Sequence, residues 1–77
     1  MWEVIGFEKA ENDAGEITSY NVHLQKPFKE GRGEGIQCHV QWYRTSDHKY
    51  VPVIGDKVML EFEARGKYVV LIDIYKV

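Results

Sequence analysis

The stretch that decides the fold is Ser19-Tyr20-Asn21-Val22-His23-Leu24-Gln25. Apolar and polar side chains alternate along it, and this period of two is typical of a half-buried β-strand. We expect the strand to run from Ile17 to about Gln25. Its inner face then carries Tyr20, Val22 and Leu24, and further strands are needed to enclose that face.

The next strand follows a loop. Residues 26–35 contain three glycines, one proline and three cations, a composition that favours a loop. Residues 36–44 then repeat the alternation and predict a second strand. Its inner face would hold Ile36, Cys38, Val40 and Trp42, with Trp42 as a core anchor. Paired with the preceding strand, it would present an outer polar row of His23, Gln25, His39, Gln41 and Tyr43.

Upstream, residues 2–8 predict an N-terminal strand, and Gly6 in its middle indicates a bulge or a sharp bend. Residues 11–16 are rich in residues that tolerate turns, so we expect a hairpin connection there. Downstream, Pro52 and the pair Gly55-Asp56 predict an irregular connection over 45–56, with room for at most one helical turn.

Two further strands complete the chain. The first starts near Lys57, carries Val58, Leu60 and the expected core anchor Phe62 on one face, and ends at the turn Arg65-Gly66. The second spans 67–76 and is apolar on both faces, so we expect a central strand that is covered on both sides.

Five short strands without a helical period predict an all-β fold in a single domain over 1–77. We expect a small five-stranded barrel, OB-like or SH3-like, with little or no helix. The core of so short a chain is small, and we therefore expect a homodimer.

Composition restricts the function. The formal net charge is −2, whereas most dedicated nucleic-acid binders have a basic excess, so any binding face must be local. One cysteine allows no internal disulfide, and the histidines lack zinc-ligand spacing, so we expect no metal and no cofactor. No catalytic motif is present, and an enzyme is not expected. Without a leader-like start or a long apolar run, we expect a cytoplasmic protein with no membrane segment.

Aromatic side chains adjoin cations at several loops and strand ends, as in Tyr43-Arg44, Lys49-Tyr50 and Lys67-Tyr68. Single-stranded nucleic acid is held by rings that stack on bases and by cations that follow the backbone. The candidate contacts are Phe28, Lys29, Arg32, Tyr43, Arg44, Arg65, Lys67 and Tyr68. The tyrosines could instead plug the barrel ends.

The segments 50–58 and 65–68, together with 3–7, resemble small β-barrel proteins of phages and mobile elements of Gram-positive bacteria. Some of these resemble the gene V class of single-stranded DNA-binding proteins. The resemblance implies an OB-like homodimer that holds the strand with loop rings and cations, here those around Arg65-Gly66 and the loop with Phe28, Lys29 and Arg32.

Two functions follow from these patterns. The first is a sequence-tolerant, non-catalytic barrel that binds single-stranded nucleic acid, with single-stranded DNA as its partner. The second is a small protein-interaction or structural module of SH3-like type, in which rings such as Tyr43 and Tyr50 receive a protein partner.

Overall fold

The computed structural model describes residues 1–29 and 31–77, so position 30 of the expected loop 26–35 lies outside the described residues. Its five strands are β1 (Trp2–Glu11), β2 (Ile17–Pro27), β3 (Ile36–Arg44), β4 (Lys57–Arg65) and β5 (Tyr68–Lys76). The expectation of an all-β fold is confirmed. Nowhere in the described residues is there a helix that could cross a membrane.

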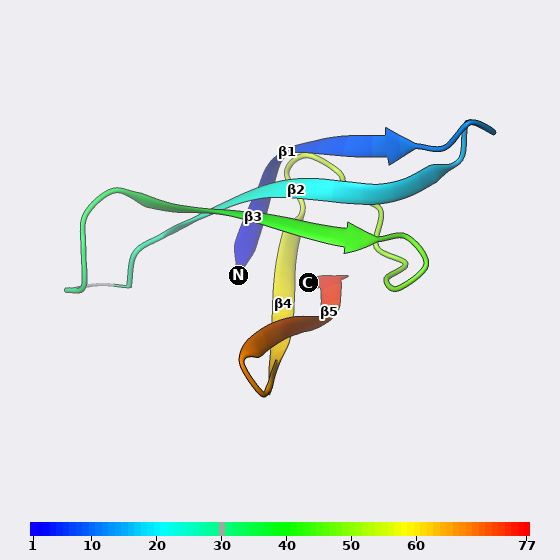
Figure 1. Ribbon diagram of the computed structural model, residues 1–77. Coiled ribbons are helices and arrows are strands. Elements are labelled where there is room, and N and C mark those ends of the chain that lie inside the picture. Colours follow the sequence, from blue (N-terminus) through cyan, green and yellow to red (C-terminus); the bar gives the residue numbers. More distant parts are fainter. Residues whose placement is uncertain (30) are drawn as a thin grey trace.

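The strands form one antiparallel sheet in the order β3-β2-β1-β4-β5. The sheet is not closed into a barrel, because β3 and β5 are edge strands that do not pair with each other. The hairpin of β2 and β3 crosses the view in Figure 1, and the β4–β5 hairpin extends below it. The two hairpins are joined through β1, which pairs with β4 only at Trp2↔Val58 and Glu3↔Lys57.

The bend of β1 occurs where the sequence indicates it. The register of β1 against β2 shifts between Val4 and Gly6, so a β-bulge separates the short part that pairs with β4 from the long part that pairs only with β2. Glycine is typical of such a bend. Beyond the bulge, β1 pairs only with β2.

The core is small and lies mainly on the inner face of the first three strands. Its fully enclosed side chains are Val4, Tyr20, Val22, Leu24, Tyr43, Val58 and Ile74. The expected inner face of β2 is confirmed, since Tyr20, Val22 and Leu24 are all buried.

The predicted orientation of β3 is wrong. Tyr43 pairs with the buried Tyr20 and is itself buried, whereas Trp42 pairs with Asn21 and is 49% exposed. The outer face thus carries Ile36, Cys38, Val40 and Trp42, and the inner face carries Gln37, His39, Gln41 and Tyr43. Trp42 is therefore not a core anchor, and Cys38 is exposed rather than a core residue. His23 and His39 lie on opposite faces of the sheet. Because β3 is an edge strand, its apolar residues can stay outside.

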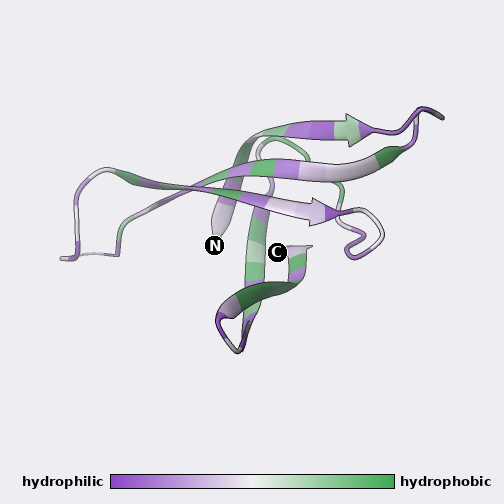
Figure 2. Ribbon diagram, viewed as in Figure 1, coloured by the Kyte–Doolittle hydropathy of each residue, from purple (hydrophilic) through white to green (hydrophobic). Residues whose placement is uncertain are grey.

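Two predictions for the C-terminal hairpin are also wrong. Phe62 is not a core anchor: the register of β4 against β5 shifts at Glu61/Phe62, and its ring is 46% exposed. β5 is an edge strand rather than a covered central one, although it is among the most hydrophobic parts of the chain (Figure 2). The predicted turn at Arg65-Gly66 is confirmed, with Gly66 at a φ of 60°.

Candidate functional site

An open groove lies between β3 and β5, where the sheet fails to close. Its volume is about 420 Å³, and we call it the seam groove. One wall is the end of β3 with the turn after it, and the other is the start of β5. The lining residues are Gln41, Trp42, Tyr43, Arg44, Asp47, His48, Tyr68, Val69, Val70 and Leu71. A second hollow, of about 550 Å³, lies between residues 47–50 and 72–76.

Hydrogen bonds fix the β3 wall of the seam groove. The hydroxyl of Tyr43 donates to the backbone oxygen of Tyr50 at 2.7 Å, and the hydroxyl of Tyr50 donates to Asp56 Oδ2 at 2.7 Å. Burial raises the pKa of the Tyr43 phenol above its ordinary value, and burial together with the hydrogen bond to Asp56 raises the pKa of Tyr50. Both phenols therefore stay neutral and act as donors well into the alkaline range.

A row of rings continues from the groove along the inner face. The ring centroids of Trp2 and His39 are 5.5 Å apart, and those of His39 and Phe62 are 6.4 Å apart in an edge-to-face arrangement. Lys26 Nζ lies 4.3 Å from the centroid of a Trp2 ring, within the range of a cation–π contact. Since Phe62 pairs with Leu71, which lines the seam groove, this ring row and the groove share one face.

The cations differ in whether a carboxylate holds them. Lys9, Lys57, Arg65 and Lys76 each have a carboxylate partner. In contrast, over the described part of the chain no carboxylate lies within ion-pair distance of Lys26, Arg44 or Lys67. Arg44 instead lies over the ring of Trp42, with Cζ 5.6 Å from the centroid. Lys26 lies at the ring row, Arg44 lines the seam groove, and Lys67 directly precedes the groove residue Tyr68.

Three of the eight residues chosen from the sequence line the seam groove together, namely Tyr43, Arg44 and Tyr68. Tyr43 is part of the core, so its ring offers no face for stacking. Tyr68 is the opposite case, with 75% of its surface exposed. Lys67 precedes it, and Arg65 pairs with it across the hairpin, where Glu63 holds the guanidinium through contacts of 2.9 and 3.1 Å.

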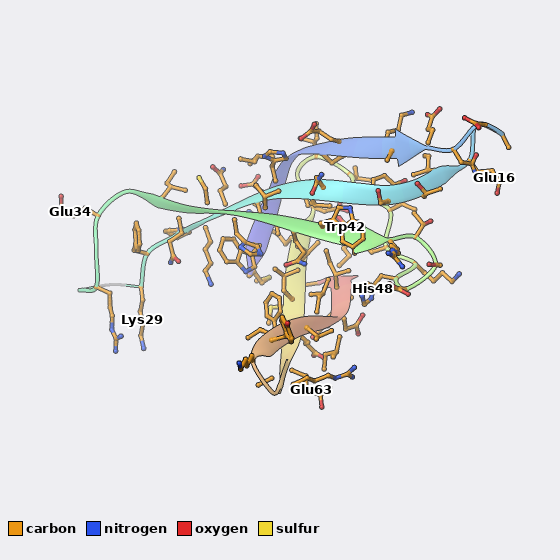
Figure 3. The ribbon with its side chains drawn as sticks, in the orientation of Figure 1. Glu16, Lys29, Glu34, Trp42, His48 and Glu63 are labelled. Carbon is orange, nitrogen blue, oxygen red and sulfur yellow. The ribbon has the colours of Figure 1, made fainter. Side chains whose placement is uncertain are left out.

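The remaining three candidates, Phe28, Lys29 and Arg32, lie apart from the groove. Figure 3 shows Lys29 at the distal end of the β2–β3 hairpin, far from Trp42 and Glu63. The Phe28 ring lies against Gly33, where an added Cβ would be 3.1 Å from its Cγ. The eight candidates thus form two separate groups rather than one site.

Sequence patterns miss the ring row. Neither Trp2 nor His39 has a cation beside it in the sequence, so the ring–cation pattern does not select them, and Phe62 is predicted in the core. In the structure, His39 pairs with the buried Leu24 and therefore lies on the inner face. That register depends on the loop between β2 and β3, whose conformation the alternation pattern does not specify.

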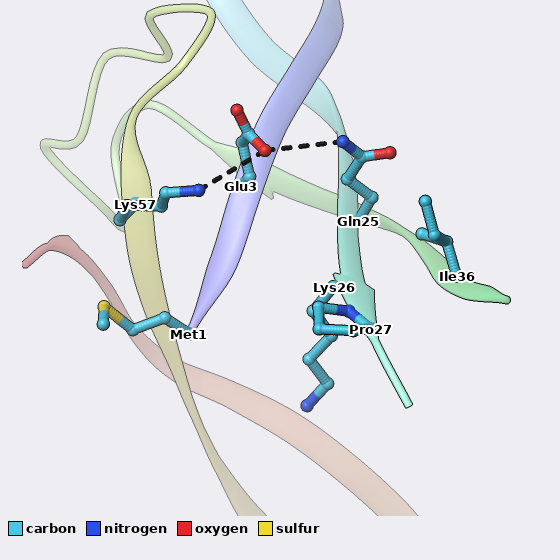
Figure 4. A pocket seen from close by; sticks show the side chains of 7 residues that line it. All are labelled: Met1, Glu3, Gln25, Lys26, Pro27, Ile36 and Lys57. Atoms are coloured by element: carbon cyan, nitrogen blue, oxygen red, sulfur yellow. Dashed lines mark hydrogen bonds and ion pairs between the residues drawn. The ribbon is translucent and has the colours of Figure 1, made fainter. Parts of the chain in front are cut away.

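A third hollow, of about 150 Å³, lies beside the N-terminus (Figure 4). Glu3 Oε1 accepts a hydrogen bond from Gln25 at 3.4 Å and pairs with Lys57 Nζ at 3.4 Å. These polar groups satisfy one another, so the hollow has little left with which to bind a ligand.

Within the described residues, no group of three or more His, Cys, Asp or Glu side chains is arranged to hold a metal ion. Comparison with protein-family models, with curated proteins and with solved structures finds no match for this chain.

Proposed function

We propose that this protein binds single-stranded nucleic acid in the seam groove and along the ring row, without sequence preference and without catalysis. The proposal is carried by two exposed rings, Tyr68 at the groove and Phe62 in the ring row, together with cations that have no carboxylate partner in the described chain, Lys26, Arg44 and Lys67. Base stacking on an aromatic ring contributes about 1–3 kcal/mol per base and is tolerant of sequence, since every base has a π-face.

The arrangement of charge supports a local binding face on a chain with a net charge of −2. Among the described residues, four of the cations are paired with acids, whereas Lys26, Arg44 and Lys67 are not, and the groove lining itself holds one acid, Asp47. Phosphate neutralised by such cations releases counterions, and binding must then weaken as salt rises.

We also propose that the sheet is an OB-like barrel left open between β3 and β5. The order β3-β2-β1-β4-β5 would become a closed five-stranded barrel if its two edge strands met. OB-folds bind oligonucleotides on strands and loops of such a barrel. The resemblance to gene V-type proteins stays a prediction of the sequence.

A protein-interaction module is the second candidate. The connection between β3 and β4 exposes three large apolar side chains, Val51, Val53 and Ile54, which have no role in nucleic-acid binding and suit a protein surface. A partner recovered in a pull-down that survives nuclease treatment would favour this function.

The test is the binding of a fluorescent oligothymidylate, measured by anisotropy at low and at moderate salt. We expect binding at low salt that weakens with salt, and a loss of about tenfold in affinity for Tyr68→Ala. Tyr75→Ala is the ring control, because Tyr75 pairs with Met59 on the outer face and donates to Glu61. Lys67→Ala is matched by Lys9→Ala, since Lys9 pairs with Glu11. Absence of binding at low salt, salt-independent binding, or equal losses in test and control variants would each refute the proposal.

A further inference from the structure

The outer face of β3 is an apolar stripe that the sheet leaves uncovered. Its four consecutive outward positions are Ile36, Cys38, Val40 and Trp42. All four side chains are exposed. They lie on the outer face of β3, whereas the buried Tyr43 lies on its inner face. A single exposed apolar residue is ordinary, but a row of four along one strand indicates a surface that is covered in use.

Charge lies beside this outer stripe rather than within it: His23, opposite Val40, pairs with Glu8, and Gln25, opposite Cys38, donates to Glu3. Across the β2–β3 ladder, the stripe pairs with Pro27, Gln25, His23 and Asn21, so the joint surface is apolar along β3 and mainly neutral along β2. Arg44, opposite Ser19, lies at one end of it. An apolar centre with charge only at the margin is the usual composition of a protein interface, and it is poor for binding phosphate.

The surface area of the chain supports the same conclusion. The chain exposes 5758 Å². A folded monomer of 9.0 kDa typically exposes about 4,850 Å², so this chain exposes about 900 Å² more than expected. A standard protein interface buries about 800 Å² on each partner. The excess is thus about what one copy contributes to a stable dimer.

We propose that a second copy of this chain packs its own outer stripe against this one, sheet against sheet. A two-fold axis near the middle of the stripe, between Cys38 and Val40, would make the contact self-complementary, as symmetric dimers require. The contact leaves the ring row of each copy open on the opposite face, while Trp42 belongs both to the stripe and to the lining of the seam groove. The contact does not depend on nucleic-acid binding, and the two proposals can fail separately.

Sedimentation equilibrium over a range of concentrations tests the dimer. We expect the wild-type chain to reach twice its monomer mass, and Val40→Lys to weaken the association at least tenfold by placing a charge in the centre of the contact. Val53→Lys is the matched control: Val53 is 57% exposed and Val40 51%, but Val53 lies outside the stripe. The control should remain dimeric. A wild-type chain that stays monomeric at high concentration, or a Val40→Lys chain that associates like the control, refutes the proposal.

Maleimide labelling of Cys38 in the wild-type chain gives a second test that needs no variant. The thiol is exposed in the single chain and would be covered in the dimer. The quantity measured is the second-order rate constant for labelling, calibrated against a small standard thiol. We expect this rate constant to fall at least tenfold as the protein concentration rises through the range in which dimers form. A rate that does not change while the mass doubles would place the contact on another surface and overturn this assignment.

Discussion

The two halves of the sheet use their hydrophobic residues in opposite ways. Among the described residues, β1, β2 and β3 supply five of the seven buried core side chains, whereas β4 and β5 supply only Val58 and Ile74. The β4–β5 hairpin is nevertheless rich in apolar residues, and two of them, Tyr68 and Val69, are more than two-thirds exposed.

The first half supplies most of the core, and the proposed function assigns binding to the hairpin. The first half is enclosed by its own strands and by the residues that join it to β4. The distal part of the β4–β5 hairpin pairs only with itself, and its exposed Tyr68 lines the seam groove. Side chains that contribute little to the core are therefore available to a ligand, and substitutions in the two halves should affect different properties.

The largest effect is expected from Leu24→Ala in the first half. Leu24 is fully buried, and truncation of a buried leucine typically lowers the free energy of unfolding by about 2–5 kcal/mol. Val69→Ala in the hairpin should lower it by less than about 0.5 kcal/mol, because Val69 is an exposed residue. Urea unfolding followed by circular dichroism measures both. Similar losses in the two variants would show that the hairpin is as tightly packed as the first half, and would remove the contrast.

Much of the fold follows from the sequence, because alternation and turn residues are local signals. The strand boundaries of β3 agree with those expected, as do the bulge at Gly6 and the turn at Gly66. The orientation of β3 could not be obtained in the same way. Both of its faces carry large side chains, with Trp42 on one and Tyr43 on the other, so hydrophobicity alone does not select the inner one. The choice follows from tertiary structure, in which the Tyr43 hydroxyl finds the Tyr50 carbonyl.

The candidate site was only partly predictable for the same reason. Adjacent ring–cation pairs identified Arg44, Lys67 and Tyr68, which do meet at the seam groove or beside it. The ring row of Trp2, His39 and Phe62 joins three different strands, and no local pattern connects residues so far apart in sequence. A register shift such as the one at Glu61/Phe62 also has no clear sequence marker.

An intermediate effect is expected at the joint between the two halves. Tyr43 and Tyr50 connect the end of β3 to Asp56, whose backbone oxygen accepts from Val4 and whose carboxylate pairs with Lys76.

Both phenols have a pKa raised above the ordinary value of 10.0. The folded state thus holds these protons more tightly than the unfolded state, and the resulting stability is complete below pH 10 and is lost as pH rises beyond it. We expect an unfolding free energy that is level from pH 7 to 9 and falls by up to about 1.4 kcal/mol per pH unit for each tyrosine above pH 10.

Urea titrations at a series of pH values measure this dependence. Lysines also titrate in this range, so the informative quantity is the difference between the wild-type chain and the double variant Tyr43→Phe with Tyr50→Phe, which should lack the tyrosine part of the slope. Tyr68→Phe is the control, because Tyr68 lies in the solvent-exposed hairpin. If the double variant loses stability above pH 10 as steeply as the wild type, the two phenols do not hold the halves together.

The smallest effect is expected from Glu63→Gln, which separates binding from stability within the hairpin. Glu63 and Arg65 are both solvent-exposed, and exposed ion pairs typically contribute less than about 1 kcal/mol, so unfolding should hardly change. Loss of the carboxylate frees Arg65 beside Tyr68, and we expect oligothymidylate affinity at low salt to rise about two- to threefold with a steeper salt dependence. Glu11→Gln changes the net charge equally but frees Lys9 at the far end of β1, so it should leave the affinity unchanged. An equal rise in both variants would mean that total charge governs binding, whereas a rise in Glu63→Gln alone would assign the phosphate contacts to the hairpin beside the groove.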